Sequence, residues 1–508
     1  MEMIKEEKKY WETVIRGSEK VSSDGDIIVP DVKPDVLKVL QIDARSVVTD
    51  KGITAGGLYA QGKIHVNILY VTDAEDETGC IKTMLDFRTK IDNPAITNDM
   101  KLRIESDVIK IDFILLNSRK LSVKATVGMD YEIIAEKSIK YSTGFDGDCT
   151  EVVKESMLLD TIGVEEEYGF TVRGAVEIPA GKPSVKELIK TDVKVLEREV
   201  KVVASKVIIN GTLGVCALYF AEDMTIDYCE GEMVFTEVFG VDDLYEDDVC
   251  STDLTVGEIE TELSEDNDGD IRIINVESFV AMNVRAGRTE EVNYICDCYC
   301  PGSKTDIEHQ ETNVMRYVDC IIKQTNEKNV IQCDTNIPEI SKIYNVVAEP
   351  EVTKCTVAKG GVTVCGKVKF YILYITKNPK CAVYSLKKEE SFEYYYNSEE
   401  VKEGMECDVK SLIEHLSYNL NSKGEIEIKY TLTNEIKVTE RVVLKCVSEA
   451  HISQQDEEND IVIYFLKEGD SLWGIGKKYG VRVSDIMEIN GLEDDKVCEG
   501  QKLLIPVS

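Results

Sequence analysis

The sequence predicts a mainly β protein, with three tandem β-sandwich-like repeats that each contain a short helix, followed by a small βααβ domain. Two observations lead to this fold class. The same spacing of proline, glycine and a Leu-Tyr pair occurs three times along the chain. After the third copy, residues 461–508 follow another pattern, in which two helical stretches lie between two strand-like ones. We therefore expect the repeats and the terminal domain to be separate folding units.

Four landmarks define the repeats. A proline precedes a glycine by 28 positions, the glycine precedes the tyrosine of a Leu-Tyr pair by 8, and an apolar pair follows that tyrosine by 51 or 52. The landmarks are Pro34, Gly62, Leu69-Tyr70 and Leu121/Val123 in the first copy, Pro183, Gly211, Leu218-Tyr219 and Ile271/Ile273 in the second, and Pro338, Gly366, Leu373-Tyr374 and Ile426/Ile428 in the third. Composition alone does not produce such spacing, so the copies should share one fold.

Local patterns around the landmarks predict the elements of each repeat. Positions two, five and six after each proline are apolar, as at Val36, Val39 and Leu40, which is the spacing of one helix face. Proline suits the first turn of a helix, so we predict a short helix there. After each glycine the apolar residues alternate, as at Ile64 and Val66, which is typical of a strand with one buried face. Each copy has the length of an ordinary domain, so we expect a chain of separate beads.

These patterns divide the chain into segments. We predict an N-terminal helical or polar extension at 1–26, repeats at 27–136, 176–288 and 331–441, connectors at 137–175 and 289–330 that pack as helices or extra strands, an acidic linker at 442–460, and the terminal domain at 461–508. The acidic run Asp266–Asp270 has some features of a calcium loop, but no glutamate stands at the required later position. We therefore predict a hairpin turn there.

Charge and the N-terminal sequence limit the partners of this protein. The chain has 508 residues, of which 95 are acidic and 59 basic, and its net charge is −36. Binding to nucleic acid requires clustered Lys and Arg, so nucleic acid is excluded as a partner. The N-terminus lacks the apolar core of a signal peptide, and no stretch is apolar enough to span a bilayer. We expect a protein that stays in the compartment where it is made, without direct membrane insertion.

The sixteen cysteines are spread along the chain, and without a secretion signal we expect them to be free thiols. Cys296, Cys298 and Cys300 form one cluster, and alternate residues of a strand share a face, so three sulfurs could contact a soft metal. No CxxC pair or histidine pair accompanies them, and buried apolar thiols are the alternative. We expect no metal and no cofactor.

The terminal domain resembles the LysM family along its full length. The resemblance rests on the sequences KEGDSLW at 467–473, KYGV at 478–481, INGL at 489–492 and GQKLLIP at 500–506. In that family, a groove between the loop after the first strand and the loop after the second helix binds glycans that contain N-acetylglucosamine. The resemblance implies a groove lined by Gly469, Asp470, Ser471, Leu472, Asn490, Gly491 and Leu492.

Structural roles compete with glycan binding at these positions. The two glycines of the predicted groove suit turns, Asp470 suits a helix cap, and Trp473 suits the core of the domain. The chain also departs from the family. Gly474 and Gly476 interrupt the first helix at about 1 kcal/mol each relative to alanine, and Glu499 stands where a proline is usual.

The repeat landmarks resemble the SPOCS family of spore-coat-associated domains. Together with LysM, this resemblance implies a non-catalytic adaptor in the mother-cell cytoplasm that is recruited to the forespore surface. Its LysM domain would dock a coat-base morphogenetic ATPase, with other coat proteins as further partners. The alternative is a cell-wall protein that binds peptidoglycan.

Enzymatic activity is not expected, because the sequence has no HExxH, GxxxxGK[ST] or GxSxG motif. An enzyme would need a polar cluster within one repeat, and Asp266–Asp270 and Cys296–Cys300 are the places to look.

Overall fold

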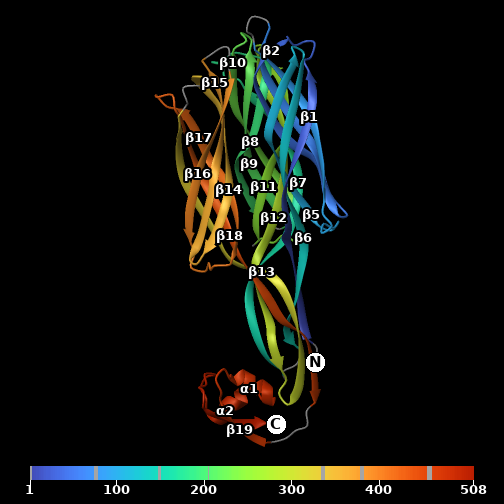
Figure 1. Cartoon of the computed structure of the whole chain (residues 1–508), viewed down its shortest axis with the longest axis vertical. Helices are drawn as coiled ribbons and strands as arrows, with labels where there is room; N and C mark the ends of the chain where they lie inside the picture. The colour runs from blue at the N-terminus through green and yellow to red at the C-terminus, as the bar shows by residue number, and fades with distance from the viewer. Residues whose placement is uncertain are drawn as a thin grey trace.

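The computed structural model describes residues 3–73, 78–146, 150–203, 205–246, 248–332, 338–377, 383–454 and 460–507. In this part of the chain, strands build three sandwiches that lie side by side, and a narrower stalk extends from them (Figure 1). The terminal domain, with the two helices of the described residues, lies at the far end of the stalk. Neither helix has the length and apolar character that crossing a bilayer requires.

Each repeat contributes six of the described strands. The first repeat holds β1 (Met3–Ile28), β2 (Val36–Thr54), β3 (Gly57–Thr72), β4 (Thr78–Asp92), β5 (Lys101–Asn117) and β6 (Lys120–Phe145). The second holds β7 (Glu151–Glu177), β8 (Val185–Val202), β9 (Lys206–Ala221), β10 (Ile226–Gly240), β11 (Val249–Glu265) and β12 (Ile271–Tyr299). The third holds β13 (Ser303–Ile331), β14 (Ile340–Ala358), β15 (Gly361–Thr376), β16 (Val383–Asn397), β17 (Glu406–Leu420) and β18 (Ile426–Gln454).

The six strands of a repeat form two antiparallel sheets. In the first repeat the strand orders are β1-β6-β5 and β2-β3-β4, and in the second β7-β12-β11 and β8-β9-β10. The third repeat has β13-β18-β17 and β14-β15-β16. A single bridge between Leu159 of β7 and Arg316 of β13 joins the outer sheets of the second and third repeats into six strands. The mainly β sandwich fold is thus confirmed.

The landmark tyrosine makes the same contact in every repeat. Its ring is fully buried in the core of its own sandwich. Its hydroxyl donates to the carbonyl oxygen of the landmark proline, at 3.1 Å for Tyr70 and Pro34, 3.2 Å for Tyr219 and Pro183, and 3.1 Å for Tyr374 and Pro338. A buried hydroxyl needs a partner, so this bond explains why the two landmarks keep a fixed spacing.

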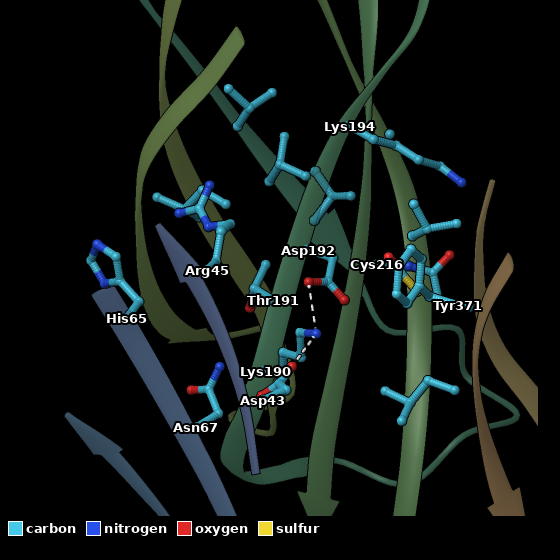
Figure 2. Close-up of a pocket in the computed structure, with 18 of the residues that line it drawn as sticks. Asp43, Arg45, His65, Asn67, Lys190, Thr191, Asp192, Lys194, Cys216 and Tyr371 are labelled. Carbon is cyan, nitrogen blue, oxygen red and sulfur yellow. Dashed lines mark ion pairs between the residues drawn. The ribbon is translucent and has the colours of Figure 1, made fainter. Parts of the chain in front are cut away.

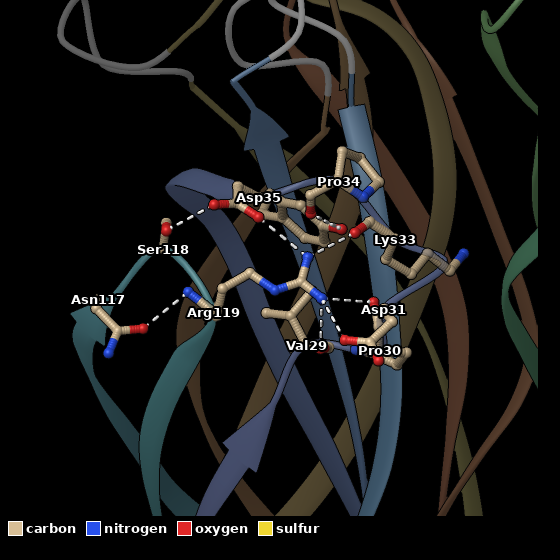
Figure 3. A network of polar contacts seen from close by, with 10 residues as sticks. Val29, Pro30, Asp31, Lys33, Pro34, Asp35, Asn117, Ser118 and Arg119 are labelled. Atoms are coloured by element: carbon tan, nitrogen blue, oxygen red, sulfur yellow. Dashed lines mark hydrogen bonds and ion pairs between the residues drawn. The ribbon is translucent and has the colours of Figure 1, made fainter.

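An arginine in the turn just before β6 holds the loop before β2 (Figure 3). The Arg119 guanidinium donates to the carbonyl oxygens of Val29 at 3.0 Å and Lys33 at 2.8 Å, and it pairs with the Asp35 carboxylate at 3.0 Å. Arg272 reaches the corresponding loop of the second repeat. These bonds give hydrogen-bond partners to loop carbonyl groups, which lie outside the strands and have no ladder partner.

The helix predicted after each proline is wrong, because β2, β8 and β14 run through that segment. Each of these strands has β-bulges at the same two places, which in β2 lie between Val36 and Lys38 and between Val39 and Gln41. A bulge adds one residue to a strand, so Val36 and Val39 both contact the core of their own sandwich. Leu40 then faces the opposite side. The apolar spacing that imitates a helix therefore comes from a bulged strand.

The segments predicted as extension and connectors are strands. The described part of 1–26 lies in β1, and 137–175 and 289–330 hold β7, β13 and the ends of β6 and β12. These segments supply the first strand of each sandwich, which pairs with the last strand. Of the predicted acidic linker, residues 442–454 continue β18, whereas residues 455–459 lie outside the described residues.

Two sequence expectations about the second repeat have different outcomes. The Asp266–Asp270 segment forms the predicted hairpin turn between β11 and β12, closed by the Asp266 amide and the Asp270 carbonyl at 2.8 Å. The apolar pair Ile271/Ile273 is wrong as the fourth landmark, because Ile274 and Val276 are the buried residues there. The buried pair lies three positions later than predicted, since Ile274 faces Val176 as Leu121 faces Ile27 in the first repeat.

The sandwiches are packed together and are not separate beads. The leucine of each Leu-Tyr pair points away from its own sandwich and joins a shared cluster, which we call the inter-repeat plug. The plug consists of Leu69, Cys80, Ile189, Cys216, Leu218, Phe220, Tyr344, Leu373 and Val383. Neighbouring residues of a strand face opposite sides, so each Leu-Tyr pair stabilises two cores at once.

The stalk is built from the same strands that close the sandwiches (Figure 1). The pairs β1/β6, β7/β12 and β13/β18 continue beyond the sandwiches as two-stranded ribbons. Their shared core contains residues of all three ribbons, namely Tyr10, Ile139, Tyr141, Met157, Leu159, Val292, Tyr294, Val314, Leu444 and Cys446. An isolated ribbon is marginally stable in water, so packing of the three ribbons is what keeps the stalk folded.

One disulfide contradicts the expectation that all cysteines are free. Cys355 of β14 and Cys407 of β17 are bonded, with Cα atoms 6.8 Å apart, and they join the two sheets of the third sandwich. The other cysteines among the described residues are free.

The terminal domain has the predicted βααβ order, with β19 (Asp460–Phe465), α1 (Leu472–Tyr479), α2 (Val483–Asn490) and β20 (Lys502–Val507). Ser471 caps α1 by accepting from the Gly474 amide at 3.1 Å, and Gly480 ends the helix in the left-handed region. The helices and strands share one core, which includes Leu472, Ile475, Ile486 and Leu503.

Helix α1 docks on the turn between β12 and β13 at the tip of the stalk. The Trp473 indole donates to the Asp297 carboxylate at 2.9 Å, and Lys477 pairs with the same carboxylate. The Tyr299 hydroxyl donates to the Val481 carbonyl at 2.9 Å. Trp473, expected in the core of its domain, therefore lies at a domain interface.

The docked position explains one departure from the LysM pattern. A Cβ atom at Gly476 would lie 2.5 Å from the Tyr299 hydroxyl oxygen, so no side chain fits there. The amide of Gly302 also donates to the Gly480 carbonyl at 2.8 Å. The cost of glycine within the helix is offset by a closer approach to the stalk.

We predict that Leu218→Ala will destabilise the whole trunk by about 2–5 kcal/mol, because Leu218 is 2% exposed in the inter-repeat plug. Urea denaturation followed by circular dichroism should show one transition that moves as a unit. Leu37→Ala is the control, since Leu37 is 60% exposed and should change stability by no more than about 0.5 kcal/mol. If Leu218→Ala instead shows several transitions and shifts the midpoint of only one of them, the repeats fold independently.

We predict that Asp297→Ala will undock the terminal domain. Burial raises the pKa of Asp297, but hydrogen bonds from Lys477 and Trp473 outweigh it and hold the pKa below its ordinary value of 3.8. Docking should therefore persist from neutral pH to about pH 4 and weaken only as the pH falls through the lowered value. In a Trp11→Phe background, the fluorescence of Trp473 should shift to the red on undocking.

The matched control for this change is Asp306→Ala, since Asp306 is exposed on the same stalk and pairs with Lys304 at the surface. Trp473 emission should not change in that variant. An unchanged emission in Asp297→Ala itself would refute the assigned interface.

Candidate functional site

The first loop of the predicted groove is occupied by contacts within its own domain. The Asp470 carboxylate accepts from the Lys467 amide and the Tyr464 hydroxyl, both at 2.9 Å. These bonds lower the pKa of Asp470, the bond from the Lys467 amide having the largest effect. Leu472 is buried in the core, and Gly469 adopts a positive φ of 84° with open space around it. Leu472 is therefore closed to a ligand, whereas Ser471 is exposed and Asp470 is partly exposed.

The second loop is held more tightly. The Asn490 side chain donates to the carbonyls of Ile486 at 2.8 Å and Leu504 at 2.7 Å, and it accepts from the Leu504 amide at 2.8 Å. Asn490 therefore locks α2 to β20. Gly491 ends α2 in the left-handed region, and Leu492 packs against the same core as Leu472. The two loops thus border one core, and the predicted groove remains a proposal.

The outer face of β19 carries an apolar stripe that the groove prediction did not include. Ile461, Ile463 and Phe465 are 62%, 55% and 61% exposed, while the alternate residues Val462 and Tyr464 pack on the core. Within the described residues β19 pairs only with β20, so its other edge is open. The sequence already indicated this stripe. In a strand with one buried face, apolar and polar residues should alternate, whereas Ile461–Leu466 is apolar throughout. We call these three residues the β19 stripe.

A second candidate site is an open cavity lined by residues of all three repeats, with a volume of about 1560 Å³ (Figure 2). It borders the inter-repeat plug at Cys216 and Leu373, and the exposed side chain of Met84 lies among its lining residues. The lining is rich in ionisable groups, namely Asp43, Arg45, His65, Lys82, Asp107, Lys190, Asp192, Lys194, Glu230, Glu232 and Glu349. No single repeat could form it.

A partly buried lysine connects the repeats at this cavity. Lys190 of the second repeat pairs with Asp43 of the first and, at 3.3 Å, with Asp192 of the second. The Tyr344 hydroxyl of the third repeat lies 3.3 Å from Asp192 and donates to the Cys216 carbonyl at 3.0 Å. Burial alone would lower the pKa of Lys190, but the two carboxylates outweigh it and raise the pKa. Lys190 is therefore charged and held in place.

The two clusters considered from the sequence do not form sites among the described residues. The Asp266 carboxylate accepts from the amides of Asp268 at 2.9 Å and Asp270 at 3.1 Å, within its own turn. Cys296 bonds to the Val153 carbonyl, and Cys298 is buried, with its pKa raised to about 11 by burial. The part of the chain that the structure describes contains no group of three or more residues placed to hold a metal ion.

Comparison with known families matches most of these elements. Residues 35–116, 184–264 and 339–421 match the family model described as "SipL, SPOCS domain", and residues 464–506 match the LysM domain. Each SPOCS match covers the middle four strands of a sandwich, from β2 to β5 in the first repeat. The first and last strands, which also build the stalk, lie outside the matches.

Curated relatives match over a stretch of the size of the LysM domain. The chain is 44% identical over 45 residues to a probable N-acetylmuramidase of Lactococcus lactis subsp. lactis (strain IL1403), which is 9% of this chain and 10% of the relative. It is 44% identical over 45 residues to the putative sporulation-specific glycosylase YdhD of Bacillus subtilis (strain 168), 9% of this chain and 11% of the relative. It is 48% identical over 40 residues to the cell wall-binding protein YocH of the same strain, 8% of this chain and 14% of the relative.

The chain thus spans about a tenth of the length of these relatives. No solved structure matches it. Its three repeats share landmarks, sheet order and the tyrosine–proline bond, and each matches the same family model. The chain therefore carries three SPOCS domains followed by a LysM domain.

Proposed function

We propose that this protein is a non-catalytic adaptor in spore coat assembly. It acts in the mother-cell cytoplasm and is recruited to the forespore surface, where its LysM domain docks a coat-base morphogenetic ATPase and other coat proteins join the complex. The SPOCS matches suggest a role in sporulation, and the β19 stripe is the observation that favours a protein partner for the LysM domain.

The stripe suits a protein surface better than a glycan. Ile461, Ile463 and Phe465 present apolar area in a line beside an open strand edge, so a partner could bury that area and extend the sheet. Glycans need placed hydrogen-bonding groups, whereas Asn490 in the predicted groove already uses its amide nitrogen and its carbonyl oxygen within the domain. The stalk holds this domain away from the sandwiches, which leaves the stripe accessible (Figure 1).

Ionisable groups in the central cavity support a non-catalytic role. Asp43 and Asp192 keep Lys190 protonated, so it is a poor nucleophile. Burial and, to a lesser extent, the charge of Glu230 raise the pKa of Cys216 to about 12. The thiol therefore stays protonated and unreactive. The His65 Nε2 atom has no hydrogen-bond partner among the described residues, so no nucleophile is activated there.

We predict that the double change Ile463→Ser and Phe465→Ser will reduce binding to the coat-base ATPase at least about tenfold, because it removes apolar area that the partner would bury. The LysM domain should remain folded, since both residues are more than half exposed. Binding is measured with the purified ATPase, and recruitment with a fluorescent fusion in sporulating cells.

Its matched control is Ile322→Ser with Val330→Ser on β13, where exposure is 60% and 46%. This control should bind and localise normally. Normal ATPase binding by the stripe variant would rule out the stripe as the docking surface.

The alternative function is peptidoglycan binding through the LysM groove, favoured by the match to the cell wall-binding protein YocH. Ser471→Asp with Gly491→Asn tests it without unfolding the domain, because aspartate also caps helices and asparagine tolerates a positive φ. We predict normal forespore recruitment of this variant. Loss of recruitment together with loss of retention on insoluble peptidoglycan would favour the wall-binding function.

A further inference from the structure

Two basic side chains lie beside each other on the wall that the first repeat contributes to the central cavity. Arg45 of β2 and His65 of β3 are direct partners in the antiparallel pairing, so their side chains lie on the same face of the sheet. Both line the cavity, and Figure 2 shows them next to each other, with Lys194 and Tyr371 across the opening. His65 is the one histidine of the chain on this lining.

Neither side chain has a counter-charge bonded to it. Arg45 donates to the Gly257 carbonyl at 2.8 Å, and in the described residues it forms no ion pair. Burial lowers the pKa of Arg45. The His65 Nε2 atom is buried without a hydrogen-bond partner in the described part of the chain, and burial, followed by the charge of Arg45, lowers the pKa of His65.

The nearby carboxylates are engaged elsewhere. Glu258 of β11, whose charge opposes this lowering, pairs with Lys63 at 3.1 Å, and the charge of Lys63 further lowers the pKa of His65. Asp192 is held by Lys190 and Tyr344. A guanidinium and an imidazole therefore share a pocket wall where the two carboxylates whose charges act on them, Glu258 and Asp192, are paired with lysines. Asp107, Glu230, Glu232 and Glu349 line other parts of the cavity. Burial of a cation without its own anion is costly, which favours binding of an anion from solution.

Two more buried polar atoms on the same cavity have no partner in the described residues, the Gln41 Oε1 atom and the Thr191 hydroxyl. Gln41 offers an acceptor, and Thr191 offers both a donor and an acceptor. The cavity volume of about 1560 Å³ exceeds that of one inorganic anion. Its lining thus combines an anion-binding pair with groups that suit hydroxyl or amino donors.

We propose that the cavity between the three SPOCS domains binds a small molecule that carries an oxyanion, with the phosphate or carboxylate group on Arg45 and His65 and hydroxyl or amino donors toward Gln41 and Thr191. The planar fork of arginine matches the oxygens of such groups, and protonated His65 adds a second charged donor. Since the lining comes from all three domains, the bound molecule stabilises their packed arrangement.

The titration of His65 provides the test. An anion that binds protonated His65 better than neutral His65 must raise its pKa, by linkage. The full-length protein has four histidines, so imidazole NMR signals can be followed through a pH titration. Inorganic phosphate should raise the pKa of His65 by about one unit relative to chloride at equal ionic strength, while exposed His451 shows the nonspecific effect.

Variants of Arg45 separate its charge from its geometry. Arg45→Gln removes the charge that lowers the pKa of His65, so that pKa should rise without phosphate, and phosphate should add little. Arg45→Lys keeps the positive charge but loses the planar guanidinium. The pKa of His65 should therefore stay low, and phosphate should raise it by less than in the unchanged protein. Arg173→Gln is the control, since Arg173 is exposed in an ion pair with Glu277 and should leave both quantities unchanged.

A second probe distinguishes the two oxyanion sources. Malonate replaces phosphate in the same titration, and the larger shift of the His65 pKa identifies a carboxylate or a phosphate as the preferred group. Thermal unfolding of the full chain should show the same order of stabilisation. The proposal is overturned if neither probe shifts His65 more than His451, or if Arg45→Gln retains the full phosphate effect.

Discussion

The structure depends on one constraint, which is that a single strand in each SPOCS domain must satisfy two cores. In β3, β9 and β15 the tyrosine of the Leu-Tyr pair packs into its own sandwich, and the leucine beside it packs into the inter-repeat plug. Strand geometry requires this division, since adjacent residues face opposite sides. The β-bulges of β2, β8 and β14 bring a further apolar residue to the plug from each domain. The three sandwiches are thereby held together.

The rest of the trunk follows from this packing. Once the inner sheets surround a common centre, their polar side chains beyond the plug line a cavity that no single domain could form. The first and last strand of each domain are brought close together at one end, where they continue as the three ribbons of the stalk. Three similar domains that did not pack against one another would form neither the cavity nor the stalk.

The LysM domain combines the core of its family with a surface that contacts the stalk. Its core and caps follow the family pattern, while Asp470 and Asn490 serve the domain itself. Gly476 departs from the family pattern and lets α1 approach Tyr299 of the stalk, and the outer face of β19 is apolar. Both features favour contact with protein. A fold known for glycan recognition is thus consistent with an adaptor, because these surfaces lie outside the predicted groove.

The sequence by itself determined the features whose partners lie close together or recur at fixed spacing. The LysM domain was recognisable because its motifs occupy one contiguous segment, and the three repeats because a buried tyrosine hydroxyl must meet a proline carbonyl 36 positions earlier in each copy. The groove residues could be named, but their roles depend on side-chain hydrogen bonds that the motif does not specify.

Only the tertiary structure decided the features that need a distant partner. Apolar residues at Val36, Val39 and Leu40 fit a helix until the neighbouring strand imposes bulges on them. A polar network beside the cavity joins Asp43, Lys190 and Tyr344 from three domains, and the stalk contact joins Asp297 to Trp473 across 176 positions. Local sequence encodes which face of an element is apolar, whereas burial of that face against a remote segment selects the final arrangement.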